Sequence, residues 1–154
     1  MELSDILAEE SVIVCSGIKT KNDVLQQLAE RGARVTGADA AAILEALTDR
    51  EALGSTGLGN GIAIPHGKLP GLAGVTAVFA RLESPVDFEA VDDQPVDLVM
   101  MLLAPIGAGA DHLKALARVA RLLRTEAIVD KLRRTGDVAG LYGVLTQPVP
   151  AQAA

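Results

Sequence analysis

Two histidines carry the clearest potential for chemistry in this sequence, and His66 has the more unusual surroundings. It lies near the end of residues 50–69, REALGSTGLGNGIAIPHGKL, a stretch that holds five glycines. Glycines at this density disfavour a long helix or strand and let the backbone turn sharply or approach another group closely. Pro65 fixes its own φ and favours an extended Ile64, so the imidazole follows a short, stiffened run at residues 62–64.

The chemistry that fits this presentation is the acceptance of a phosphoryl group. A neutral imidazole is nucleophilic near pH 7, and backbone N–H groups in glycine-rich segments bind anions. We therefore expect His66 to carry a phosphoryl group. The alternative is a turn histidine whose ring is satisfied by ordinary hydrogen bonds.

His112 and Arg50 are the second and third candidates. We expect His112 in the first turn of a helix capped by Asp111, where the helix N-terminus favours a nearby anion and a neutral ring. An exposed ring at a capped helix start is an equally good interpretation. Arg50 lies in the last turn of a predicted helix, where a cation complements the helix dipole, but its guanidinium also matches phosphate oxygens. A joint role requires His66, His112 and Arg50 to meet in space.

Other motifs fail on spacing. Five residues, rather than four, separate Gly61 from Gly67, and Leu69 replaces the Ser or Thr of a P-loop. Two distant histidines and one cysteine form no recognisable metal set. Seven basic residues fall in one region, which is either a solvated helix face or a docking surface for an acidic partner. They are Lys114, Arg118, Arg121, Arg124, Lys131, Arg133 and Arg134.

Composition narrows the class of protein. A chain of 154 residues with 49% hydrophobic residues is long enough for one domain with its own core. A formal net charge of −6 argues against nucleic-acid binding as the main activity. The sequence has no apolar run long enough for a membrane span, and its acidic start does not resemble a signal peptide. With its single cysteine, Cys15, these features predict a cytoplasmic protein without membrane insertion.

Strand and helix patterns alternate along the chain and predict the α/β class, with a sheet covered by helices on both faces. The fully apolar pattern of residues 96–104 indicates a central strand. A strand at 75–82 should end at Ser84-Pro85. We predict one domain at 1–146 and a flexible tail at 147–154. The other predicted strands are 11–16 and 62–64, and the predicted helices are 20 to about 32, 39–52, 112–124, 126–133 and 137–145.

Core positions in the 112–124 helix follow from its helical spacing. The expected core residues are Leu113, Leu116, Ala117, Ala120 and Leu123. No strongly apolar exposed surface is evident, so we expect a monomer or a weak dimer.

Residues 50–69 resemble the active-site signature of the enzyme IIA domains of the bacterial phosphotransferase system, fructose/mannitol class. Residues 88–105 and 112–124 match the same family. The resemblance implies a three-layer α/β/α sandwich with a central mixed sheet. It implies that His66 accepts a phosphoryl group, at the tele position, from an HPr-like phosphocarrier protein, and that His112 and Arg50 stabilise the phosphoryl oxygens. It further implies phosphoryl or partner binding by Gly54, Ser55, Thr56, Gly57, Asn60 and Gly61, without a metal or diffusible cofactor.

Within this family the chain is most similar to the nitrogen-related branch. Asn60 stands where sugar-transporting relatives commonly have an acidic residue, and we expect no attached membrane-transport or IIB domain. We therefore expect a regulator of targets such as potassium-transport proteins, sensor kinases or stringent-response enzymes. The alternatives are a sugar-specific IIA component that passes phosphate to a IIB domain, and an interaction module that has lost phosphotransfer.

Overall fold

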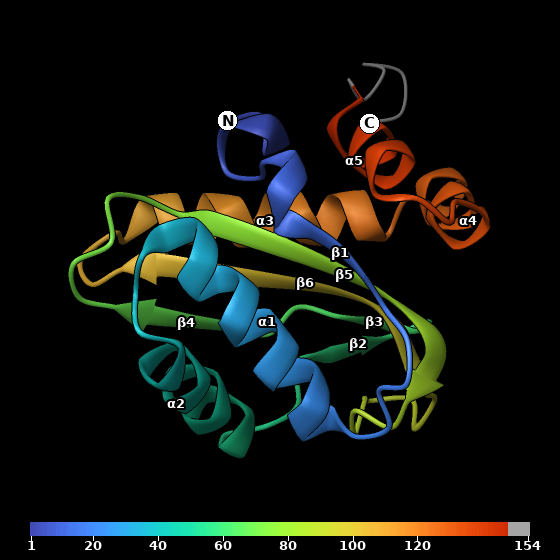
Figure 1. Ribbon diagram of the computed structural model, residues 1–154, viewed down its shortest axis with the longest axis horizontal. Coiled ribbons are helices and arrows are strands. Elements are labelled where there is room, and N and C mark those ends of the chain that lie inside the picture. Colours follow the sequence, from blue (N-terminus) through green and yellow to red (C-terminus); the bar gives the residue numbers. More distant parts are fainter. Residues whose placement is uncertain (148–154) are drawn as a thin grey trace.

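Three layers make up the fold, as the sequence predicted. The computed structural model describes residues 1–147, so the expected tail at 147–154 lies outside them except for Gln147. A central sheet has α1 (Lys21–Thr36) and α2 (Ala40–Ala52) on one face. The other face is covered by α3 (Ala110–Leu123), α4 (Glu126–Arg134) and α5 (Val138–Thr146) (Figure 1).

The sheet is mixed and six-stranded. Its strands are β1 (Val12–Cys15), β2 (Gly57–Gly59), β3 (Ile62–Ala63), β4 (His66–Leu69), β5 (Thr76–Val86) and β6 (Val96–Pro105). Strand β6 pairs antiparallel with β5 on one side. On its other side β3 and β4 follow each other in parallel register, with Ile62 opposite Leu98 and His66 opposite Leu102. The carbonyl of Pro65, between these two short strands, accepts a bond from the Leu102 amide.

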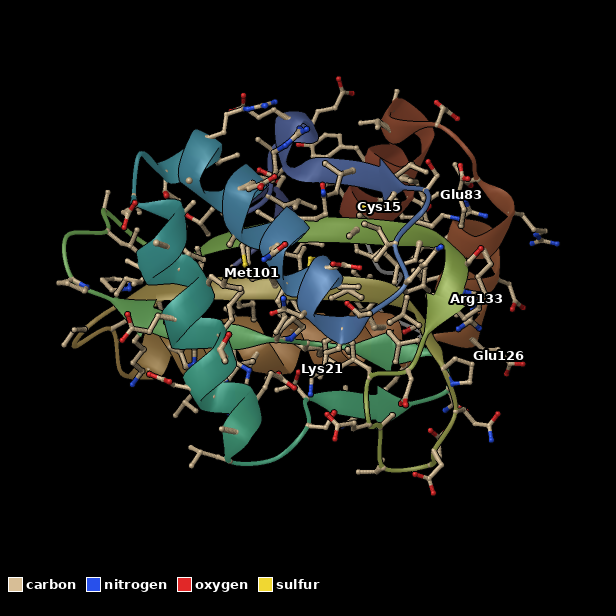
Figure 2. All side chains as sticks on the ribbon, turned by 60° about the horizontal axis from the view of Figure 1, so that its bottom comes forward. Cys15, Lys21, Glu83, Met101, Glu126 and Arg133 are labelled. Atoms are coloured by element: carbon tan, nitrogen blue, oxygen red, sulfur yellow. The ribbon has the colours of Figure 1, made fainter. Side chains whose placement is uncertain are left out.

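The predicted central strand is confirmed. Alternate residues of β6 enter the two cores: Met101 packs under α1, while Met100 and Leu102 face α3 and its neighbours. Figure 2 shows Met101 between the sheet and α1. A side chain at Gly32 of α1 would place its Cβ 3.0 Å from the Met101 methyl group, a tight contact that favours glycine at this position of the helix.

Side-chain caps set three of the helix starts where the sequence predicted them. Thr20, Asp39 and Asp137 each accept a backbone N–H from the first turn of α1, α2 and α5. Helix α1 runs past its predicted end at Gly32 and stops at Gly37, whose φ of 80° suits a left-handed C-cap.

Strand β5 passes the point at which the sequence predicted its end. It continues through Ser84-Pro85 to Val86. The register with β6 shifts between Arg81 and Val86, and such an irregularity tolerates a residue that has no N–H to donate.

The predicted cap of α3 was wrong, and its predicted core face was right only in part. Gly109 occupies the N-cap position and Asp111 lies inside the first turn. The buried stripe is His112, Ala115, Val119, Leu122 and Leu123, whereas Leu113 is 67% exposed and Ala117 is exposed. Of the expected core residues, Leu123 is buried and Leu116 and Ala120 are partly buried against the core. The sequence prediction considered only apolar residues, and it missed the buried face of α3 because that face begins with His112.

Candidate functional site

A pocket of about 750 Å³ opens between α2, β4 and the start of α3. Arg50, His66 and His112 all line it, together with exposed Leu53 and Leu113. The three residues that the sequence singled out come from three elements, and α3, which carries His112, is far along the chain from α2 and β4. The fold therefore brings Arg50, His66 and His112 together in one pocket, as a joint role requires.

The ring of His66 is oriented by the main chain. Its Nδ1 lies 2.9 Å from the carbonyl oxygen of Ile64. A carbonyl oxygen can only accept, so Nδ1 must carry the hydrogen in this contact. In the neutral ring Nε2 then keeps its lone pair and is the nucleophilic atom. The ring is half-buried, which leaves part of it accessible to a partner.

His112 faces the same space from the first turn of α3. The centroids of the two imidazole rings are 5.6 Å apart, with their planes at 51°. Burial lowers the pKa of His112, and the nearby His66 and Lys68 lower it further by charge repulsion. A neutral His112 offers one N–H donor to a group bound beside His66. Within the described part of the chain, its buried Nδ1 has no hydrogen-bond partner.

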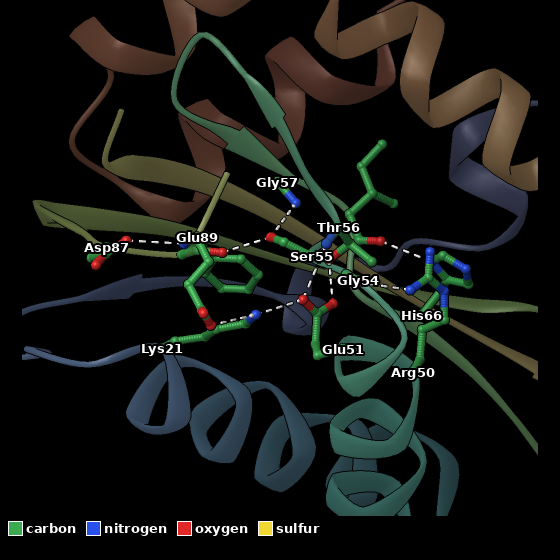
Figure 3. Close-up of polar contacts among 12 residues, drawn as sticks. Lys21, Arg50, Glu51, Gly54, Ser55, Thr56, Gly57, His66, Asp87 and Glu89 are labelled. Carbon is green, nitrogen blue, oxygen red and sulfur yellow. Dashed lines mark hydrogen bonds and ion pairs between the residues drawn. The ribbon is translucent and has the colours of Figure 1, made fainter. Parts of the chain in front are cut away.

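Arg50 projects from the last turn of α2, as predicted. Its Nη1 donates to the carbonyl oxygen of Gly54 at 2.8 Å, which fixes the guanidinium at the pocket. Figure 3 shows the guanidinium beside the His66 ring. A guanidinium has five N–H donors, so this one bond leaves others for the oxygens of an anion.

The predicted binding residues of the glycine-rich loop are placed elsewhere. Gly54 presents its carbonyl to Arg50, but Ser55 donates to the carbonyl of Phe88 and Thr56 donates to Glu51, and in Figure 3 these two contacts lie apart from the His66 ring. None of Gly54, Ser55, Thr56, Gly57, Asn60 and Gly61 lines the pocket.

The tip of the β2–β3 hairpin makes contacts of its own. Asn60, at a φ of 57°, donates its N–H to Asp92, and its carbonyl accepts a bond from Arg133. A side chain at Gly61 would collide with the Arg133 guanidinium. This glycine therefore serves close packing in the structure, and Arg133 ties the hairpin to α4.

Sequence reasoning missed the apolar rim of the pocket. Leu53 is 85% exposed and Leu113 is 67% exposed, so the expectation of no exposed apolar surface was wrong. Leucines at helical spacing indicate a core, and nothing local separates a core leucine from one that borders a pocket. Lys68, which also lines the pocket, follows the PHG motif and could have been suspected from it.

Two further properties concern the described residues 1–147. No helix among them is both long and apolar enough to cross a lipid bilayer. No group of three or more His, Cys, Asp or Glu side chains among them is arranged to hold a metal ion.

Comparison with known proteins defines the class. Residues 5–147 match the family model for the EIIA 2 component of the phosphoenolpyruvate-dependent sugar phosphotransferase system. A "Nitrogen regulatory protein" of Bradyrhizobium diazoefficiens is 52% identical over 154 residues and covers both chains fully. A fructose-specific EIIA component of Haloferax volcanii is 39% identical over 127 residues, 82% of this chain and 81% of that protein.

A solved structure agrees in fold and family. The nitrogen regulatory protein IIA-Ntr from Neisseria meningitidis superposes with a TM-score of 0.87 at 32% identity. The match covers 94% of this chain and 99% of that one. The protein therefore belongs to the EIIA 2 family of the phosphotransferase system, as the resemblance of residues 50–69 indicated.

Proposed function

We propose that the protein is a regulatory phosphocarrier of the nitrogen-related phosphotransferase system, with Nε2 of His66 as the phosphoryl acceptor. The observation that carries this proposal is the bond from His66 Nδ1 to the Ile64 carbonyl, in a pocket shared with His112 and Arg50. The name of the Bradyrhizobium relative supports the nitrogen-regulatory branch. Family membership supports phosphoryl transfer as its chemistry.

The donor is a phosphohistidine on an HPr-like carrier. Its N–P bond breaks as a new N–P bond forms to Nε2 of His66, and the carrier nitrogen recovers its electron pair. The His66 ring becomes cationic while Nδ1 keeps its hydrogen, so the Ile64 carbonyl stabilises the charge as it develops. No proton has to move during this step.

His112 and Arg50 act on the transferred group. Phosphoryl transfer depends mainly on positioning and on stabilising charge over the phosphoryl oxygens. Neutral His112 donates a hydrogen bond from the α3 side, and Arg50 supplies a full positive charge from α2. The first turn of α3 adds the positive end of a helix dipole.

Phosphorylation would turn this surface into a switch. A phosphoryl group brings about −1.5 to −2 charges to a pocket bordered by exposed Leu53 and Leu113. A target that buries these leucines would bind the unmodified form more readily. The protein acts in the cytoplasm on targets of the potassium-transport, sensor-kinase or stringent-response kind.

Intact-mass spectrometry at alkaline pH tests the proposal, because phosphohistidine is acid-labile. The protein is incubated with phosphoenolpyruvate, enzyme I and an HPr-like carrier that is shown to be charged. We expect one phosphoryl adduct on the wild type and none on His66→Ala. An adduct on the histidine variant would refute the assignment, and no adduct on either protein would leave an interaction module as the function.

A sugar-specific role is the second candidate, favoured by the 39% identity to a fructose-specific EIIA component. In that case the phosphorylated protein would pass its phosphoryl group to a IIB domain. Incubation of the phosphorylated protein with IIB domains from the same genome, followed by mass spectrometry, distinguishes the two. Rapid transfer to one IIB domain supports the sugar role, and retention on His66 supports the regulator.

A further inference from the structure

A largely buried ion pair lies next to the glycine-rich loop. Lys21 Nζ of α1 is 2.9 Å from Glu51 Oε1 of α2, and their side chains are 16% and 6% exposed. Lys21 also lies 4.9 Å over the centroid of the Phe88 ring. Burying a charge is costly unless hydrogen bonds satisfy it fully, so the partners of Glu51 are informative.

Both carboxylate oxygens of Glu51 also accept hydrogen bonds from one residue of the loop, Thr56. Its Oε1 accepts the backbone N–H of Thr56 at 3.1 Å, and its Oε2 accepts the hydroxyl of the same threonine. Thr56 is only 4% exposed, and the Lys21 ammonium balances the charge of the carboxylate. Figure 3 shows Lys21, Glu51 and Thr56 joined in this order.

Thr56 is in turn hydrogen-bonded to Ile64, the residue whose carbonyl orients the His66 ring. The carbonyl of Thr56 accepts the N–H of Ile64 at 3.1 Å. The carbonyl of Ile64 accepts the hydrogen on His66 Nδ1 at 2.9 Å. Both backbone polar groups of Ile64 are therefore engaged, its N–H with Thr56 and its carbonyl with His66.

We propose that Glu51, held by Lys21, is a positioning residue that fixes the ring orientation and tautomer of His66 through Thr56 and Ile64. Glu51 touches no reacting group. Its neighbour Arg50 holds the same loop at Gly54 from the pocket side, so the last turn of α2 fastens the loop at two points. This inference extends the proposed function. Its transfer-rate test depends on the proposed function, whereas its NMR test does not.

The variant Glu51→Gln removes the charge and one acceptor while keeping the shape of the side chain. The matched control is Glu89→Gln, which removes the other carboxylate near Lys21, at 3.5 Å and 77% exposed. Nitrogen-15 NMR of the imidazole ring reports which nitrogen of His66 carries the hydrogen. We expect a fixed Nδ1–H form in the wild type and in Glu89→Gln, and a mixture of both tautomers in Glu51→Gln.

Phosphorylation by the carrier is the second measurement. A misplacement of about 1 Å can cost on the order of 100-fold in rate, so we expect at least about a tenfold loss in Glu51→Gln. Glu89→Gln should transfer at the wild-type rate. If the NMR result holds but neither the wild type nor the variants are phosphorylated, the positioning role stands and the proposed function fails.

Thr56 variants decide the matter if Glu51→Gln does not fold. Thr56→Val keeps the shape but loses the hydroxyl, whereas Thr56→Ser keeps the bond to Glu51. We expect Thr56→Val to mix the tautomers and Thr56→Ser to restore the single form. A folded Glu51→Gln or Thr56→Val with the tautomer of the wild type would overturn the inference.

Discussion

The imidazole rings of His66 and His112 lie 5.6 Å apart between centroids, although one belongs to β4 and the other to α3. Two cationic rings at this distance would repel each other. The pair therefore favours a neutral His112 until a negative group arrives between the rings. Phosphorylation of His66 supplies such a group, so charge on one ring is linked to chemistry on the other.

This linkage predicts a pH dependence of stability. The pKa of His112 in the fold is lowered from 6.5, first by burial, so the unfolded chain binds the proton more readily. The contribution of His112 to the free energy of unfolding should be constant well above pH 6.5 and should decrease as the pH falls below 6.5 toward the lowered pKa of the folded state. Urea titrations over this range should show a smaller slope for His112→Gln. Equal slopes in both proteins would contradict the assignment.

Phosphorylation should reverse the shift at His112. A phosphoryl group beside the ring favours the cationic form, so the pKa of His112 should rise above its value in the unmodified protein. Proton NMR titration of the two forms measures this directly. An unchanged pKa would mean that the phosphoryl group does not approach His112.

The exposed rim of the pocket should set carrier affinity. Leu113→Asp places a charge on a side chain that is 67% exposed, so the fold should persist while docking weakens. We expect a rise in the apparent KM for the phosphorylated carrier with little change in the maximal rate. Val91→Asp is the matched control, because Val91 is 79% exposed and does not line the pocket. An equal effect of both variants would argue against docking at this rim.

Close packing behind the loop should make Gly57 intolerant of a side chain. A Cβ there would lie 2.7 Å from the Cβ of Ala90 and 2.9 Å from its Cα. Overpacking of this kind costs about 1–3 kcal/mol, so Gly57→Ala should lower the free energy of urea unfolding by that amount. Gly136→Ala, which meets nothing within 4 Å, should leave it unchanged.

Much of the fold was predictable from local signals. The apolar run of β6 marked the middle of the sheet, and the helix starts predicted at residues 20, 39 and 137 coincide with the capping residues Thr20, Asp39 and Asp137. The errors arose where tertiary context overrode a local rule. Strand β5 passes Pro85 because its pairing with β6 is irregular there, which no local pattern reveals.

The site was predictable in its residue types but not in its arrangement. Arg50, His66 and His112 stood out by type and surroundings, yet only the fold shows that they share a pocket. The apolar residues of α3 could not reveal that His112 begins the buried stripe and that Leu113 borders the pocket. Glu51 gave no signal, because its importance depends on Lys21 and Thr56, which reach it from other elements.

Arg50 and Glu51 are consecutive, and they hold the same loop from opposite sides. An α-helix turns by about 100° per residue, so consecutive side chains diverge by that angle. The number of residues in α2 between its cap at Asp39 and its last turn therefore sets the directions in which the Arg50 and Glu51 side chains point. Inserting or deleting a single residue there would rotate both side chains away together, so that the loop would lose both contacts with α2 and the pocket would lose its guanidinium.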